Sequence, residues 1–129
     1  MATDNPSADP DPYDSTSRDL SARVALLLND TQKASFEGHI AVRLRPTDAT
    51  VYEAPVLADI RLGKLKEAED MLRSGLSLVQ PPDSLQLHLL LAEVLHAAKR
   101  DDEARVEVEA ALAIDPQNRT ALQLKQDYK

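Results

Sequence analysis

The sequence has no cysteine, so a thiolate nucleophile and thiolate metal ligands are excluded. The candidates that remain for acid–base or metal chemistry are three histidines and a large set of carboxylates. His88 and His96 are eight residues apart, which places them about 80° apart around a helix, unlike the i, i+4 pairs that bind one metal ion. Glu37 is two residues before His39, and residues at that separation do not face each other on a helix. We therefore expect no acid–base pair, no metal site and no cofactor.

The sequence motifs of common enzyme classes are also missing. There is no GxxxxGK[ST], GxGxxG, HExxH or GxSxG motif, and three glycines leave little material for a phosphate-binding loop. Carboxylates such as Glu67, Glu69 and Glu103 alternate with Lys and Arg, a pattern typical of solvent-exposed helix faces. We predict that the chain is not an enzyme.

The net charge of −7 is concentrated at the N-terminus. Asp4, Asp9, Asp11 and Asp14 fall within the first fourteen residues, which contain no Lys or Arg. The rest of the chain is mildly acidic, and such a charge repels phosphate groups. We therefore expect no nucleic-acid partner and no membrane insertion, and we expect the partner to be another protein.

The elements that would position a site are helices. Residues 1–14 combine Pro, Asp and Ser and lack the apolar residues of a core, so we expect a disordered acidic tail there and one folded domain over residues 15–129. From about Ser17, apolar residues recur at helical spacing, and short polar breaks divide the chain into seven segments. Four positions in or next to these breaks are predicted to cap the next helices: Asp30 or Thr31, Asp48, Asp83 and Asp115.

A repeat is visible in these segments. Ala68 lies 34 residues after Ala34. In the turns that precede these alanines, Gly63 likewise lies 34 residues after Asn29. This interval is the period of about 34 residues that is typical of tetratricopeptide repeats. Residues 85–118 resemble that repeat most closely. At the family's large, small and terminal proline positions they carry His88, Leu91, Ala92, Leu95, Ala104, Val108, Ala111 and Pro116.

The resemblance implies an all-α fold, a right-handed stack of three antiparallel helical hairpins. The repeats would cover residues 15–48, 49–84 and 85–118. Residues 119–128 would form a capping helix, whose polar outer side closes the end of the stack.

The register of the second repeat has two solutions, because the interval from Ala68 to Ala104 is two residues longer than the interval from Ala34 to Ala68. If the two extra residues lie between Gln80 and Ser84, Pro55 and Asp59 take positions that the family keeps apolar and buried. If instead the turn at Gly63 is two residues shorter, Pro55 lies near the start of its helix, where proline costs little. We predict the shorter turn.

In this family the first helices of the hairpins line a concave groove that binds a peptide or a helix of a partner. The variant of the groove that grips the C-terminal carboxylates of chaperone tails needs Lys, Arg and Asn, whereas this chain offers mostly Asp, Glu and Leu. A ligand with apolar and basic residues is therefore expected. By analogy the groove residues are Asp19, Arg23, Leu27, Leu57, Asp59, Leu89, Glu93 and His96.

These observations favour a non-catalytic protein–protein interaction module. Two alternatives stay open: a small secretion-type chaperone that holds an apolar segment of a client, and a scaffold that self-associates as a homo-oligomer. The sequence has no signal peptide and no apolar stretch of membrane-spanning length, so we expect a cytoplasmic protein.

Overall fold

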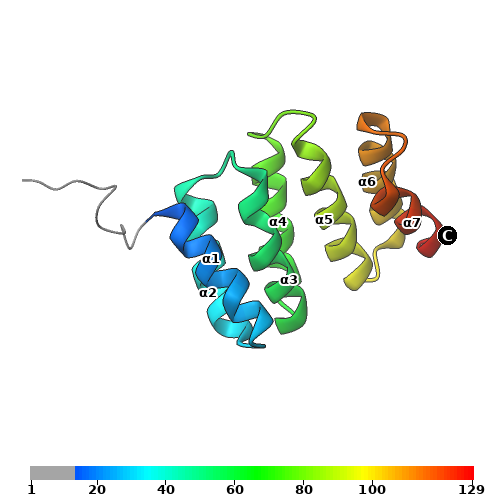
Figure 1. The fold of residues 1–129 in the computed structure, drawn as a ribbon. Helices are drawn as coiled ribbons and strands as arrows, with labels where there is room; N and C mark the ends of the chain where they lie inside the picture. The colour runs from blue at the N-terminus through cyan, green and yellow to red at the C-terminus, as the bar shows by residue number, and fades with distance from the viewer. Residues whose placement is uncertain (1–13) are drawn as a thin grey trace, which may run out of the picture.

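The computed structural model describes residues 14–129 and has the predicted all-α architecture, with no strand in that range. Three antiparallel helical hairpins stack side by side, and a last helix packs on the final hairpin (Figure 1). The predicted tail of residues 1–14 lies, except for Asp14, outside the described residues. The helices are α1 (Ser15–Leu27), α2 (Thr31–Leu44), α3 (Glu53–Leu62, preceded by a 3-10 turn, Ala49–Tyr52), α4 (Leu65–Leu76), α5 (Ser84–Ala97), α6 (Asp101–Ile114) and α7 (Arg119–Asp127).

The same turn joins the two helices of every hairpin. Asn29, Gly63 and Lys99 each have a positive φ, of 64°, 77° and 63°. The amide of the residue after each of them donates to the carbonyl five residues earlier, at 2.8 Å in all three turns. A residue in the left-handed conformation, followed by a hydrogen bond of this kind, satisfies carbonyl groups that the end of a helix leaves free. The three turns therefore mark equivalent positions in the three repeats.

These equivalent turns show that the predicted register of the second repeat was wrong. The interval from Gly63 to Lys99 is two residues longer than the interval from Asn29 to Gly63. The turn at Gly63 is therefore not shortened, and the two extra residues lie after it. They lie in the connection between α4 and α5, residues 77–83, which is longer than the connections 45–48 and 115–118. Pro55 and Asp59 consequently take the positions of Leu91 and Leu95 in the third repeat.

Pro55 is tolerated in a buried position because of its neighbour on α2. Gly38 lies so close to the proline ring that a Cβ on the glycine would be 2.6 Å from the Cβ of Pro55. Val108 is the third-repeat equivalent of Gly38, and its side chain is buried. The missing side chain on α2 thus makes room for the ring on α3.

The helix starts follow the predicted capping in two of four cases. The side chains of Asp30 and Asp48 accept hydrogen bonds from Lys33 N and Thr50 N, which satisfies amides that a helix leaves free. Asp83 makes no such bond, because its backbone is already helical. The cap predicted at Asp115 was also wrong, because Asn118 caps α7 by accepting from Ala121 N, whereas Asp115 accepts from Gln117 N before the helix begins.

The core is continuous through the second and third hairpins. Its largest fully buried side chains include Leu72, Leu87, Leu91 and Leu95. The capping helix α7 joins this core through Ala121 and Tyr128 and leaves mainly polar side chains outside. The limits that we assign to the individual repeats stay predictions.

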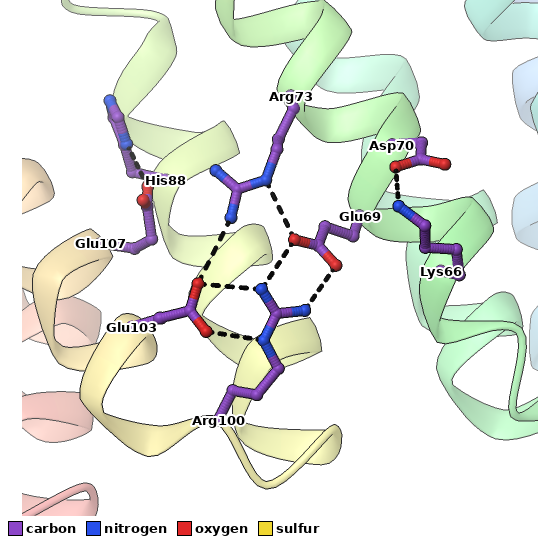
Figure 2. Close-up of polar contacts among 8 residues, drawn as sticks. All are labelled: Lys66, Glu69, Asp70, Arg73, His88, Arg100, Glu103 and Glu107. Carbon is purple, nitrogen blue, oxygen red and sulfur yellow. Dashed lines mark hydrogen bonds and ion pairs between the residues drawn. The ribbon is translucent and has the colours of Figure 1, made fainter.

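Charged residues connect the second hairpin to the third. Figure 2 shows Arg100, at the start of α6, between Glu69 of α4 and Glu103 of α6. Arg100 donates to both oxygens of Glu69, at 2.7 and 3.1 Å, and Arg73 donates to Glu69 at 3.0 Å. Glu69 has only 7% of its surface exposed, so the expectation that this charge pattern lies entirely on solvated helix faces was wrong for Glu69.

A contact between a basic side chain and a glutamate recurs at one position inside the hairpins. Arg18 and Glu37 approach to 2.7 Å in the first repeat, and His88 and Glu107 approach to 2.7 Å in the third. Both pairs have the same separation in sequence and join the first helix of a hairpin to the second. His88, which stands where the family prefers Trp, is therefore held by a carboxylate in place of an apolar contact.

Candidate partner-binding groove

The first helices of the hairpins, α1, α3 and α5, carry a connected surface of two clefts. One cleft, of about 270 Å³, is mostly apolar. The other, of about 530 Å³, lies beside the connections that precede α3 and α5. The clefts share Arg23 and Glu53, and we refer to them together with Glu93 and His96 as the groove. The smaller cleft is lined by Arg23, Leu26, Leu27, Glu53, Ala54 and Leu57. The larger cleft adds Thr47, Asp48, Ala49, Thr50, Pro82, Asp83, Leu85 and Gln86.

Arg23 is the one cation among the residues that line these two clefts. Its guanidinium donates to Asp19 at 2.9 Å, to Glu53 at 3.2 Å and to the carbonyl oxygen of Thr50 at 2.8 Å. The hydrogen bond with Asp19 raises the pKa of Arg23. Because two carboxylates already neutralise this cation, the groove presents a net negative charge.

Glu93 adds a carboxylate that is partly buried. Burial raises the pKa of Glu93, and the negative charge of Glu53 on the neighbouring helix raises it further. No side chain or amide of residues 14–129 forms a hydrogen bond or ion pair with it. A partly dehydrated carboxylate next to a like charge favours a cation from outside.

His96 lies at the C-terminal end of the groove beside the capping helix. Its ring stacks on Tyr128 with centroids 4.4 Å apart and planes inclined by 19°. Its Nδ1 lies 2.9 Å from an oxygen of Asp101. Burial, followed by the charge of Glu93, raises the pKa of Tyr128 to about 12, so the phenol is neutral at physiological pH.

Arg23, Leu27 and Leu57 line the smaller cleft, and Asp19 lies beside it through its hydrogen bond with Arg23. Glu93 and His96 lie farther along, near Tyr128. Two of the predicted residues do not line an open surface. Leu89 is 4% exposed and belongs to the core, because the neighbouring helices cover its position on α5.

Asp59 is the second correction, since it is fully buried against α2. Ser35 Oγ donates to Asp59 Oδ1 at 2.6 Å, and His39 Nε2 lies 2.6 Å from Asp59 Oδ2. The carboxylate sits between the serine and the histidine, whereas a catalytic triad needs the histidine between the serine and the carboxylate. These contacts satisfy a buried charge at a position that the family keeps apolar.

Glu53 is the groove residue that the sequence reasoning missed. It lies one repeat period after Asp19, just as Leu57 lies one repeat period after Arg23. The same period that revealed the repeat would have indicated Glu53, had the second repeat been aligned in the observed register. The wrong register instead placed Pro55 at this position and Asp59 at the position of Leu57.

No group of three or more His, Asp or Glu in residues 14–129 is placed to hold a metal ion. None of the helices in the same range has both the length and the apolar character to cross a membrane.

The comparisons with known proteins agree with this geometry. The tetratricopeptide repeat family model matches residues 59–128, which is more than half of the 129 residues. A search of curated protein sequences finds no match. Solved tetratricopeptide domains share the fold at sequence identities of 15–21%.

Three of these solved structures cover nearly the whole chain. The Arabidopsis OM64 domain has a TM-score of 0.73 at 21% identity, covering 89% of this chain and 93% of its own. The first domain of human RPAP3 has a TM-score of 0.78 at 15% identity, covering 92% and 91%. The first domain of Spaghetti (RPAP3), bound to the HSP90 peptide SRMEEVD, has a TM-score of 0.75 at 15% identity, covering 92% of each chain.

Proposed function

Because this chain belongs to the tetratricopeptide repeat family, we propose that it is a non-catalytic interaction module whose groove binds a segment of another protein. The observation that carries the proposal is the groove itself, in which apolar and acidic side chains from separate repeats line one continuous surface. Peptide recognition by helical scaffolds uses apolar anchors for affinity and charges for specificity.

The chemistry of the groove favours a basic and apolar ligand. Leu26, Leu27 and Leu57 offer a cleft for one apolar side chain, and Glu53 and Glu93 would face a Lys or Arg of the ligand. Burial and, second, the charge of Glu53 raise the pKa of Glu93. Pairing with a cation of the ligand would relieve the repulsion between the two carboxylates.

The same charges argue against an acidic ligand. The peptide bound by the Spaghetti (RPAP3) domain has the sequence SRMEEVD and so carries three carboxylic side chains. In this chain Asp19, Glu53 and Glu93 would repel them, and Arg23 is already neutralised. Like charges brought together at an interface cost several kcal/mol.

Affinity capture from a lysate, with variants of matched chemistry, tests this proposal. Leu57→Glu places a charge in the apolar cleft, and Val106→Glu places the same charge at an exposed site on α6. We expect a protein captured by the parent and by Val106→Glu to be lost with Leu57→Glu. Equal captures by the parent and both variants would remove the groove from the interaction.

A further inference from the structure

The groove already holds one guanidinium, which belongs to Arg23 of α1. Its Nε donates to Asp19 at 2.9 Å, its Nη1 to Glu53 at 3.2 Å and its Nη2 to the carbonyl oxygen of Thr50 at 2.8 Å. Three nitrogen atoms thus donate to acceptors on α1, on α3 and on the turn before α3. A planar fork of donors can serve several acceptors in this way, whereas an ammonium is a compact point charge.

The next repeat presents the same place without an arginine. Glu53 lies one repeat period after Asp19. Leu57 lies one repeat period after Arg23, so an apolar side chain stands where the first repeat has its guanidinium. Glu93 of α5 takes the position of Leu57 in the third repeat, because the turns of these two repeats are separated by the same interval. Leu57 therefore has one carboxylate a turn before it on its own helix and another beside it on the next helix.

The two carboxylates beside Leu57 have few hydrogen-bond donors. Glu53 accepts one bond at Oε1, from Arg23, and its Oε2 has no hydrogen bond within residues 14–129. Burial and then the charge of Glu53 raise the pKa of Glu93, and no cation lowers it. The two carboxylates therefore lack a second cation.

The nearest basic side chains on the same helices do not supply this cation. Arg61, one turn after Leu57, is exposed and forms no ion pair within the described residues. The Nδ1 of His96, one turn after Glu93, lies 2.9 Å from an oxygen of Asp101. Neither Arg61 nor His96 is among the groups that shift the pKa of Glu93. The place over Leu57 is thus open to a cation of the ligand.

The surroundings of this place favour a guanidinium over an ammonium. The larger cleft next to it adds the carboxylates of Asp48 and Asp83 and no cation besides Arg23. Because Leu57 is apolar and Glu93 is partly buried, a cation that binds there gives up part of its water. A guanidinium is more weakly hydrated than an ammonium and so loses less. Its fork also reaches two carboxylates at once, as the fork of Arg23 does.

We propose that the groove binds an arginine of its ligand over Leu57, with the guanidinium donating to Glu53 and Glu93, and that it selects arginine over lysine there. The inference rests on the proposed function, because it specifies the basic residue of the same ligand. The apolar cleft lies between α1 and α3 and the arginine place between α3 and α5, so the two are about one helix spacing, 8–10 Å, apart. An extended ligand covers that distance in about three residues.

A substitution tests the place without any ligand. Leu57→Arg puts an arginine at the repeat equivalent of Arg23, where it should pair with Glu53 and Glu93. An opposite charge at close range lowers the pKa of a carboxyl by about 1–3, so the pKa of Glu93, measured by NMR titration, should fall by that amount. The uncharged control Leu57→Gln should leave it near its value in the parent. An unchanged pKa of Glu93 in Leu57→Arg would overturn the proposed place.

Short peptides test the selectivity. The probes are Gly-Leu-Gly-Gly-Arg-Gly with blocked ends and the same peptide with Lys or citrulline in place of Arg, and NMR titration measures their affinities. We expect the Arg peptide to bind the parent about tenfold tighter than the Lys peptide, which corresponds to one further hydrogen bond between charged groups. Glu53→Gln/Glu93→Gln should bind the two peptides alike, and Glu67→Gln, outside both groove clefts, should bind like the parent.

The peptide results separate this inference from the proposed function. Equal affinities of the parent for the Arg and Lys peptides would overturn the selection of arginine and would leave a basic ligand standing. If the citrulline peptide bound as tightly as the Arg peptide, or if none of the three bound, the basic ligand of the proposed function would be contradicted and this inference with it.

Discussion

Pro55 of α3 packs directly on Gly38 of α2, and the space between them would not hold even a methyl group. An added Cβ on Gly38 would lie 2.6 Å from the Cβ and 2.7 Å from the Cδ of the proline ring. The rigid ring cannot rotate away, and forcing extra atoms into a packed site costs about 1–3 kcal/mol. Gly38→Ala should therefore lower the free energy of unfolding by about that amount, despite the higher helix propensity of alanine.

Urea denaturation of Gly38→Ala beside the parent checks this expectation. The double variant Gly38→Ala/Pro55→Ala provides the control, because the second change opens the space that the first one fills. The double variant should recover part of the loss. A single variant that unfolds at the parent's midpoint would contradict the proposed contact.

The buried Asp59 gives the second prediction. Ser35→Ala removes the hydroxyl that donates to Asp59 Oδ1 at 2.6 Å and leaves His39 as the remaining side-chain partner. A hydrogen bond to a charged group contributes about 1.5–3 kcal/mol, so Ser35→Ala should lose stability of that order. Ser74→Ala, at an exposed position of α4, should unfold like the parent.

Equal unfolding midpoints for Ser35→Ala and Ser74→Ala would show that the hydroxyl of Ser35 does not stabilise the buried carboxylate. The comparison is informative because both substitutions remove one oxygen from a helix and change helix propensity alike.

The third prediction concerns acid stability and the contact between the second and third hairpins. Hydrogen bonds from Arg100 and Arg73 lower the pKa of Glu69, and Arg100 also lowers the pKa of Glu103. The ordinary pKa of glutamate is about 4.3–4.5, so the unfolded chain takes up these protons at a higher pH than the folded chain does. Their stabilising contribution is complete above that range and is lost as the pH falls through the lower folded-state pKa.

Unfolding free energies measured from about pH 7 to about pH 3 test this linkage. Glu69→Gln should be less stable than the parent at neutral pH and should lose less stability on acidification. Glu67→Gln, an exposed position on the same helix, should follow the parent. An unchanged pH slope in Glu69→Gln would contradict the role assigned to the ion pairs.

The fold was predictable because its signals repeat. Three turns with the same hydrogen bonds recur at Asn29, Gly63 and Lys99, and small residues such as Ala34, Ala68 and Ala104 recur where helices cross. A pattern of this kind remains visible even where single positions carry unusual residues. The helical hairpins and the capping helix follow from it.

The register of the second repeat could not be derived from that pattern. Pro55 and Asp59 break the rules of their own positions, and what compensates them lies on another helix, where Gly38 makes room and Ser35 and His39 bind the carboxylate. Such compensation depends on contacts between residues that are distant in the sequence. Each member, viewed alone, looks like a departure from the family.

The error in the register of the second repeat also affected the predicted groove residues. A shift of two residues placed Pro55 at the position of Glu53 and Asp59 at the position of Leu57, and so hid the contact between Arg23 and Glu53. The prediction that the groove is mixed apolar and acidic did not depend on the register, because acidic residues occupy both alternatives. The expectation about the ligand was thus less sensitive to the register than the choice of groove residues.

Selection from a display library of random short peptides is the most direct test of the claim that the groove prefers basic and apolar ligands. The parent should enrich sequences in which Lys or Arg lies near a large apolar residue, and should deplete Asp and Glu. Glu53→Gln/Glu93→Gln should lose the preference for Lys and Arg, while Glu67→Gln, outside both groove clefts, should retain it. Enrichment of acidic peptides like SRMEEVD, or the same enrichment with and without Glu53 and Glu93, would contradict the account.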